Sequence, residues 1–123
     1  MAKNYIQDGD VMPYTNSGAA IASGAVVAVG NMIGIALGDI AATTGTGQLA
    51  VADVWEVPKV TASAIAKGEK LLWDSSEGKF DNSAATAASG DILGAAVAWE
   101  AAAANTTTTV KVKLTPGNTV VTP

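Results

Sequence analysis

A short motif that occurs twice constrains the fold of this 123-residue chain more than any other feature of its sequence. Ile21 and Gly24 begin one segment of strand-forming residues, and Ile65 and Gly68 begin another. The two copies are offset by 44 residues at both positions (65 − 21 and 68 − 24). A repeat of this period indicates that one small structural unit occurs twice. We therefore expect a domain made from two related halves.

Short runs of β-branched and apolar residues between glycine turns predict that both halves consist of strands. The clearest run covers residues 106–114, where Val110, Val112 and Leu114 alternate with lysines and so share one face of a strand. Many short strands favour an all-β barrel or sandwich, and the repeat favours a small β-barrel of two related halves. Further strands are expected at residues 11–14, 21–29, 32–37, 49–59, 69–73 and 92–99.

Three details of this pattern are less regular. Residues 62–66 fit one helical turn, and the alanines at 101–104 fit either a helix or a loop. Gly94 aligns with Gly34 at an offset of 60, so the second half carries about 16 extra residues (60 − 44), which we place between residues 74 and 91.

The length corresponds to a single domain. We divide it into an extended N-terminal arm at residues 1–10, one β domain at residues 11–115 and a loose C-terminal tail at residues 116–123. The arm lacks the apolar run of a signal peptide. The longest apolar tracts are short and interrupted by glycine, so we expect no membrane-spanning segment.

Composition argues against most catalytic and nucleic-acid functions. The chain has no His, Cys or Arg, which removes the usual general base, the commonest metal ligands and the bidentate phosphate clamp. Seven lysines face eleven acidic residues, for a net charge of −4, whereas nucleic-acid binding relies on basic patches. We expect no enzyme activity, no cofactor and no nucleic-acid partner.

The polar clusters of the sequence are better explained as structural features than as active sites. Asp8 and Asp10 indicate a turn, because no further oxygen ligands follow at the spacing of a calcium loop. Ser63 and Lys67 lack the other groups that a hydrolase requires. Residues 45–47 contain glycine but do not form a phosphate-binding motif.

Two kinds of residue and one segment remain as candidates for interaction with other molecules. Trp55, Trp73 and Trp99 each lie near the end of an expected strand, where filling a core of small residues is favoured over lining a binding site. Lys111 and Lys113 predict a solvated strand face, and such a face is also a candidate contact between copies of the chain. The arm has no evident role in the fold, so it is either disordered or adds to a neighbouring sheet by backbone pairing.

Several short motifs in fixed order carry a resemblance to a known family across residues 1–114. They are Met1–Asp10, Ser23–Gly24, Val29–Gly30, Ile33–Ala36, Val54–Lys59, Ile65–Gly68, Leu72–Asp74, Leu93–Ala96 and Val110–Leu114. Together they resemble the phage capsid cement-like, or head decoration, proteins of tailed phages and prophages.

The resemblance implies a structural virion protein that binds the outer surface of an icosahedral head and stabilises it. Members of this broad class are β-rich, tulip-like domains, commonly trimeric at three-fold and quasi-three-fold positions, with the N-terminal arm touching the shell. The implied partners are the major capsid protein and further copies of the chain. The implied location is the capsid exterior, after synthesis in the cytoplasm of the host bacterium. The implied capsid-interface residues are Ala2, Lys3, Asn4, Tyr5, Ile6, Gln7 and Asp8.

An alternative is a non-enzymatic β-barrel binding module of a phage tail, baseplate or fibre. Such a module requires an exposed groove lined by aromatic side chains, for which Trp55 and Trp99 are the candidates.

Overall fold

The computed structural model describes residues 3–123, which contain ten β-strands and no helix. The all-β class predicted from the sequence is therefore confirmed. Residues 62–66 form a loop with an isolated β-bridge at Ile65 rather than the expected helical turn, and residues 101–104 also form a loop. The strands are β1 (Val11–Thr15), β2 (Val26–Val29), β3 (Met32–Ala36), β4 (Thr46–Ala50), β5 (Val54–Pro58), β6 (Lys70–Asp74), β7 (Lys79–Asp81), β8 (Ile92–Ala98), β9 (Thr109–Leu114) and β10 (Val120–Val121).

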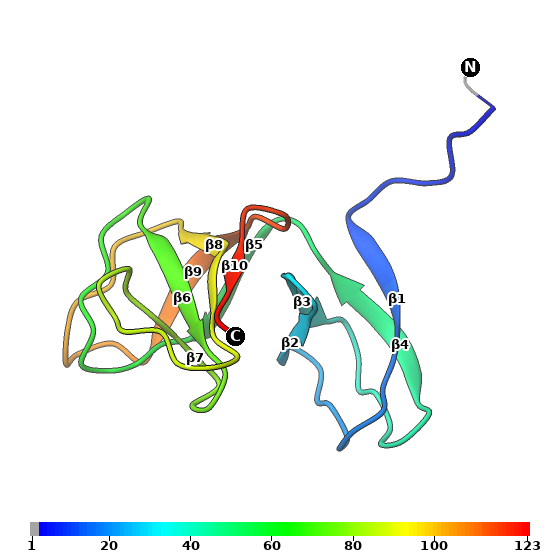
Figure 1. Cartoon of the computed structure of the whole chain (residues 1–123), viewed down its shortest axis with the longest axis horizontal. Coiled ribbons are helices and arrows are strands. Elements are labelled where there is room, and N and C mark those ends of the chain that lie inside the picture. Colours follow the sequence, from blue (N-terminus) through cyan, green and yellow to red (C-terminus); the bar gives the residue numbers. More distant parts are fainter. Residues whose placement is uncertain (1–2) are drawn as a thin grey trace.

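These strands form two antiparallel sheets that lie side by side (Figure 1). The first sheet has the strand order β1-β4-β3-β2, and the second has the order β5-β9-β8-β6-β7, with the short β10 beside β8. The sheets do not close into a barrel, which corrects the barrel form of the prediction. In the second sheet, one parallel bridge between Lys59 and Phe80 joins the far edges, and no continuous ladder follows it.

The chain passes from one sheet to the other within the segment expected to be one strand at residues 49–59. That segment contains the last two residues of β4 and all of β5, with residues 51–53 between them. Asp53 has a φ of 76°, in the left-handed region that a strand residue does not adopt. This turn in the backbone sends β5 into the second sheet, and it explains why the strands divide between two sheets.

The two sheets repeat one arrangement, because β1, β2, β3 and β4 take the places that β5, β6, β8 and β9 take in the second sheet. The repeated sequence motifs make the same contacts in each half, so the two related halves are present in three dimensions. The matched contacts are the bridges Ile21–Ile40 and Ile65–Ala102, the N–H···O=C bonds from Gly24 to Ala36 (2.7 Å) and from Gly68 to Ala98 (2.8 Å), and the ladder pairs Val26–Ile35 and Lys70–Val97.

The returning strand of the second half is offset differently from the sequence alignment. The ladder pairs match Gly34 with Ala96, not with Gly94 as the sequence suggested. Gly94 lies where the β6–β8 register shifts, between Leu93 and Val97, and has a φ of 90°. A glycine is required there by the local backbone, which only glycine adopts without strain. The extra residues of the second half do lie between β6 and β8, where they include β7.

Two groups of buried side chains form the core. The smaller group belongs to the first half and contains Val27, Ala36, Ile40 and Leu49. The larger group fills the second half, and Ile33, Ile35 and Ala50 of the first half join it. The two halves therefore share one hydrophobic core across their contact. In the larger core, the rings of Trp73 and Phe80 meet edge to face, with centroids 5.0 Å apart.

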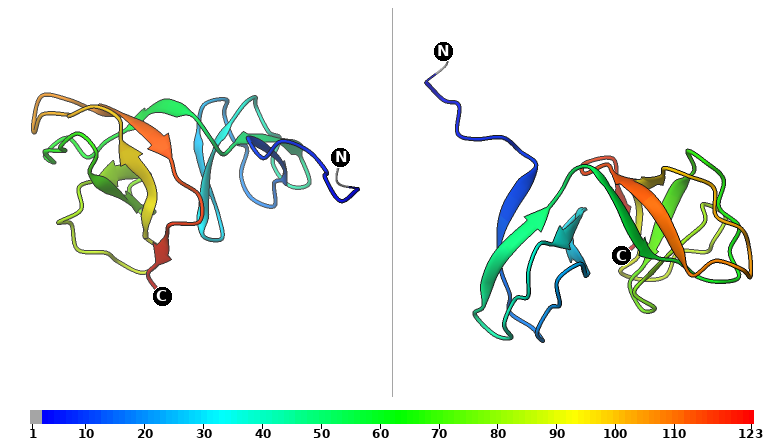
Figure 2. Two further views of the ribbon diagram at one scale, coloured as in Figure 1. Left: turned by 90° about the horizontal axis from the view of Figure 1, so that it is seen from above. Right: turned by 180° about the vertical axis from the view of Figure 1, so that it is seen from behind.

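The two ends of the chain differ in how they contact the fold. The described part of the arm, residues 3–10, is exposed throughout and extends away from both sheets (Figures 1 and 2). The tail is not loose over its whole length, because Val120 and Val121 pair with Leu93 and Ile92 of β8. Their backbone groups complete the edge of β8 that β9 leaves unpaired, which corrects the expectation for this part of residues 116–123.

Candidate interaction surfaces

The predicted interface residues of the arm lie together in one exposed segment. Lys3, Asn4, Tyr5, Ile6, Gln7 and Asp8 are all exposed, whereas Ala2 lies outside the described residues. The Tyr5 side chain is 61% exposed and the Ile6 side chain is 83% exposed. The arm therefore presents two exposed apolar side chains outside both sheets.

One contact gives the arm local structure. The Tyr5 hydroxyl donates a hydrogen bond to the Asp8 carboxylate over 2.8 Å, and this bond raises the pKa of the Tyr5 phenol. The arm then runs into β1, which is an edge strand of the first sheet. It is therefore a polar, extended continuation of a sheet edge, which is a suitable geometry for backbone pairing with another sheet.

A second surface lies on the outer face of the second sheet. Along β8, β9 and β5, side chains that are direct neighbours in the ladder form rows on this face. Because β9 alternates as predicted, Lys111 and Lys113 point outward while Val110, Val112 and Leu114 are buried. We call this surface the lysine face and define it by Val54, Glu56, Val97, Trp99, Lys111 and Lys113.

The lysine face combines an apolar centre with separated charges. The Trp99 side chain is 50% exposed, and Val54 at the other side of the face is 38% exposed. The Lys111 ammonium lies 3.5 Å from the Glu100 carboxylate, and both side chains are about half exposed. Lys113 forms no ion pair within residues 3–123. The face therefore presents Trp99 beside the ion-paired Lys111, with the unpaired Lys113 opposite Val97.

The tryptophans occupy three different environments. Trp73 is buried in the core, as the sequence favoured. Trp55 is half-buried against the same core, and its indole N–H donates to the Ala52 carbonyl over 2.7 Å. Trp99 is on the opposite, outer face of the sheet. Trp55 and Trp99 therefore lie on opposite faces of the second sheet.

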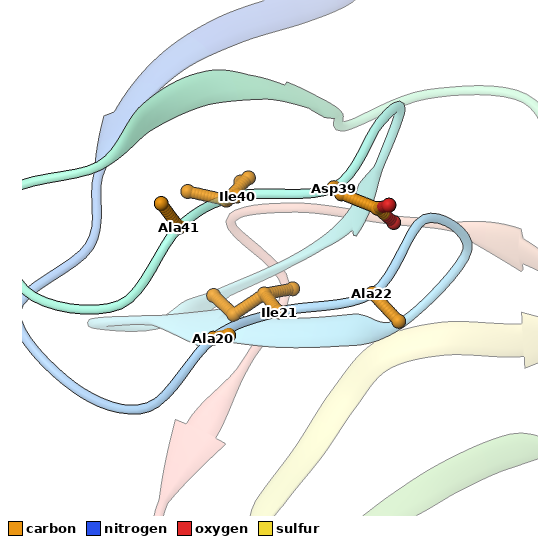
Figure 3. A pocket seen from close by; sticks show the side chains of 6 residues that line it. All are labelled: Ala20, Ile21, Ala22, Asp39, Ile40 and Ala41. Atoms are coloured by element: carbon orange, nitrogen blue, oxygen red, sulfur yellow. The ribbon is translucent and has the colours of Figure 1, made fainter.

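One shallow hollow of about 490 Å³ lies in the first half, and Figure 3 shows the residues around it. Its lining is apolar apart from Asp39, whose carboxylate already accepts a hydrogen bond from the Ser23 N–H over 2.8 Å. The hollow therefore holds no convergent polar groups that could bind or transform a small molecule. The lining residues are Ala20, Ile21, Ala22, Asp39, Ile40 and Ala41.

The other polar candidates have structural roles. The Ser63 hydroxyl donates to the Asp81 carboxylate of β7, and Lys67 is exposed in the turn before β6. Gly45 directly precedes β4, Thr46 and Gly47 belong to it, and Asp10 precedes β1. Within residues 3–123 no group of three or more metal-binding side chains comes together, and no helix is present that could cross a membrane.

Sequence reasoning missed three buried polar residues, namely Asn16, Lys59 and Asp91. The Asp91 carboxylate accepts hydrogen bonds from the Ser75 N–H at 3.1 Å and from the Ala88 N–H at 2.9 Å. All three hold loops to strands. Their isolated positions in the sequence carry no pattern that would have identified them.

A comparison with known families gives a match over most of the chain. The phage cement protein family matches residues 6–114, which is most of the chain and nearly the span of the resemblance noted in the sequence. A search of curated proteins found no match. Cement proteins are structural components of the phage capsid, so the bacteriophage, capsid and structural assignments hold, and nothing in the family is enzymatic. Because this match spans both halves, the chain belongs to the phage cement protein family.

Proposed function

We propose that this protein binds the outer surface of an icosahedral phage head, contacts the major capsid protein and stabilises the shell. The observation that carries the proposal is the exposed arm, whose Tyr5 and Ile6 side chains are 61% and 83% exposed. A protein whose family role is structural needs complementary surfaces rather than a reactive site. The arm supplies such a surface at one end of the molecule (Figure 2).

The arm binds in this proposal by extending an edge of a capsid sheet. Residues 3–8 leave their backbone N–H and C=O groups free of any strand ladder within the described chain. Main-chain hydrogen bonds to an exposed edge would then provide affinity, and alternate side chains would fill pockets on the shell. Ile6 is the strongest apolar anchor, because its side chain is 83% exposed and docking would remove this apolar area from water.

The protein acts in this proposal as a homotrimer at three-fold and quasi-three-fold positions of the head. Three arms from one trimer engage neighbouring capsid subunits together, so that the second and third contacts gain from a high effective concentration. A contact of standard size removes about 800 Å² from each partner. That area is a modest part of the 6926 Å² that this chain exposes.

The test mixes purified protein with expanded, undecorated heads and images them by electron cryomicroscopy. We expect density on the outer surface at three-fold positions. A variant that lacks residues 2–8 should leave the heads bare, because the anchor is gone, while its circular dichroism spectrum and urea unfolding match the full chain.

A matched pair of point variants narrows the test to side chains. Ile6→Ser should weaken head binding by about tenfold or more, as expected for an anchor that becomes buried. Thr108→Ala changes an exposed residue in the loop at the far end of the second half and serves as the control. Full decoration by the arm deletion would refute the role of the arm, and absence of any density on the head would refute the proposed function.

A further inference from the structure

The β2 strand has one open edge, whereas its counterpart β6 is paired on both sides. β6 pairs with β8 on one side and with β7 on the other. β2 pairs with β3, and within residues 3–123 no strand pairs with its other edge. The Ala36 N–H donates to the Ala25 carbonyl over 2.9 Å, and hydrogen-bonded pairs alternate along antiparallel strands. The N–H and C=O groups of Val26 and Ala28 therefore point to the open edge.

In the second half, the insertion occupies the position that is open beside β2. Its strand β7 lies along β6, and the residues after β7 bond to the loop that precedes β6. The contacts are Phe80 opposite Trp73, the Ser63 hydroxyl donating to the Asp81 carboxylate, and the Asn82 amide donating to the Ala64 carbonyl over 3.3 Å.

The corresponding positions of the first half are less covered. The second-half side chains are those of Ile65, Leu72 and Trp73, which are 3, 3 and 7% exposed. At the constant offset of 44 residues they match Ile21, Ala28 and Val29. Ile21 and Val29 are half-buried and Ala28 is exposed. The shallow apolar hollow lies at the same place, because residues 20–22 form half of its lining (Figure 3).

The arm repeats the pattern of the insertion. Residues 5–7 are Tyr-Ile-Gln, and residues 80–82 are Phe-Asp-Asn, so each segment has an aromatic side chain first and an amide third. In an extended strand the first and third side chains point to the same face. Placed as the insertion is placed in the second half, the arm would set its aromatic ring beside Val29 and its amide near the Ala20 carbonyl.

The middle residue differs between the two segments, and its partner differs with it. In the second half, the Asp81 carboxylate accepts a hydrogen bond from the Ser63 hydroxyl. In the first half, Ala19 stands at the position of Ser63, and the arm has Ile6 at the position of Asp81. A polar pair is thus replaced by an apolar pair, so the arm is suited to the open site of the first half.

The direction of the docked strand excludes the arm of the same copy. The Lys59–Phe80 bridge is parallel, so β7 runs parallel to β5, and a strand docked in the same way on β2 runs parallel to β1. The arm joins β1 through Gly9 and Asp10 alone, whereas a parallel connection needs about a dozen residues. The arm also extends away from both sheets of its own copy (Figure 1). The arm of a second copy has neither restriction.

We propose that the open edge of β2 binds the arm of a second copy, with residues 5–7 in the places that residues 80–82 take in the second half. The arm adds a strand to the first sheet through main-chain hydrogen bonds, and Tyr5 supplies the buried aromatic side chain. This inference concerns the protein before it meets a head, and it rests on the proposed function only for the competitor. A docked arm has its apolar side chains covered, so the shell must compete for it.

The test places a photoreactive group on the arm of the full chain. Tyr5→p-benzoylphenylalanine is mixed with the ¹⁵N-labelled full chain and irradiated, and the crosslinked peptides are identified by mass spectrometry. We expect crosslinks from the arm to residues 19–29 that join a labelled copy to an unlabelled one. Crosslinks that stay within one copy, or that miss residues 19–29, would overturn the proposal.

A matched pair of variants tests the strand edge. Ala28→Pro removes an outward N–H, and the proline ring blocks the approach of a strand, so the crosslink yield should fall by about tenfold. Proline is tolerated on an edge strand at such a position, and circular dichroism checks the fold. Ala28→Val keeps the N–H and should leave the yield unchanged. Equal yields from the two folded variants would contradict docking at this edge.

A second pair of changes tests the side chains without touching β2. Ile6→Asp should lower the crosslink yield, because a carboxylate would lie against Ala19. Ala19→Ser in the same chain should restore much of the yield, since it recreates the hydroxyl–carboxylate pair of the second half. Absence of this rescue would refute the placement of residues 5–7.

Head binding separates this inference from the proposed function. Ala28→Pro should decorate heads at a lower protein concentration than the full chain, because docking no longer withholds a fraction of the arms. An unchanged concentration would refute the competition between site and shell. Decorated heads without crosslinks between copies would refute this inference alone, and bare heads with such crosslinks would refute the proposed function alone.

Discussion

The side chain of Lys59 is 1% exposed, although lysine is the residue least suited to burial. Its ammonium donates hydrogen bonds to the carbonyls of Val60, Thr61 and Thr107, at 2.9, 3.1 and 3.3 Å. Three donors thus meet three acceptors, which offsets the loss of water around the charge. The bonds join the end of β5 to the loop between β8 and β9.

In the first half, the corresponding buried polar residue is an asparagine. Asn16 follows β1 as Lys59 follows β5, and it is 3% exposed. Its amide donates to the carbonyls of Ala19 at 2.7 Å and Ala41 at 3.1 Å. Both halves therefore place a buried hydrogen-bond donor after the corresponding strand, although the residue type differs.

Replacement of the buried lysine should be costly. Lys59→Met keeps most of the length of the side chain but removes three hydrogen bonds. The Val60 and Thr61 carbonyls still accept from the Ser63 and Asn105 N–H groups, whereas the Thr107 carbonyl loses its donor. We therefore expect a loss of about 1–3 kcal/mol in the free energy of unfolding. Urea unfolding followed by circular dichroism measures it. Lys67→Met, at an exposed position, should change stability by less than about 0.5 kcal/mol. Equal effects of the two changes would contradict the structural role of Lys59.

At the scale of elements, the carboxylates of Glu69 and Asp74 accept hydrogen bonds that hold the extra segment of the second half. The Glu69 carboxylate accepts hydrogen bonds from the Ala66 N–H at 2.9 Å and from the N–H and hydroxyl of Ser83 at 2.7 Å. Asp74 closes the turn after β6 in a similar way, accepting from the Ser76 hydroxyl at 2.8 Å and the Glu77 N–H at 3.1 Å. These bonds hold the polar turns of the insertion, and Phe80 of β7 anchors it in the core.

The Glu69 bonds make stability depend on pH. The Ala66 N–H, and after it the Ser83 groups, lower the pKa of Glu69 below that of the unfolded chain, which is about 4.3. The bonds therefore contribute fully above that unfolded value, and the contribution is lost as the pH falls through it to the lower pKa of the folded state. Glu69→Gln should reduce the difference in urea midpoint between pH 6 and pH 3. Glu77→Gln, at an exposed carboxylate, should leave that difference as it is.

The bulge in β8 depends on Gly94. Its φ of 90° disfavours any other residue, and an added Cβ would meet the backbone carbonyl of Asn118. We expect Gly94→Ala to lower the free energy of unfolding by about 3 kcal/mol, from backbone strain and overpacking together. Gly38→Ala is the matched change, because a Cβ there meets no atom within 4 Å, and it should be nearly neutral. A neutral Gly94→Ala would mean that the bulge rearranges without cost.

Local patterns in the sequence predicted the elements better than their assembly. The alternation at residues 109–114 and the turn at Gly30 and Asn31 appear in the structure as β9 and the two-residue β2–β3 connection. The division of residues 49–59 into β4 and β5 was missed, because Asp53 can enter the left-handed region without any glycine to mark it. The exposed arm follows from its composition, whereas the lysine face could be recognised only after the ladder placed Trp99 beside Lys111.

At the scale of the whole molecule, the shared core predicts that the two halves unfold together. All three tryptophans lie in the second half, so tryptophan fluorescence reports on that half alone. Ile35 belongs to β3 of the first half, is 2% exposed and packs into the larger core. Its truncation therefore tests whether a defect in one half is felt by the other.

Ile35→Ala should lower the free energy of unfolding by about 3 kcal/mol, the cost of a large-to-small change in a packed core. We expect the urea transition seen by tryptophan fluorescence to shift as far as the transition seen by far-ultraviolet circular dichroism, because one cooperative unit gives coincident transitions. Leu49→Ala, in the separate core of the first half, should shift both signals as well if the halves are coupled. A fluorescence transition that stays in place while the circular dichroism transition moves would show that the halves unfold independently. That result would contradict the prediction that the core contact of Ile35 couples them.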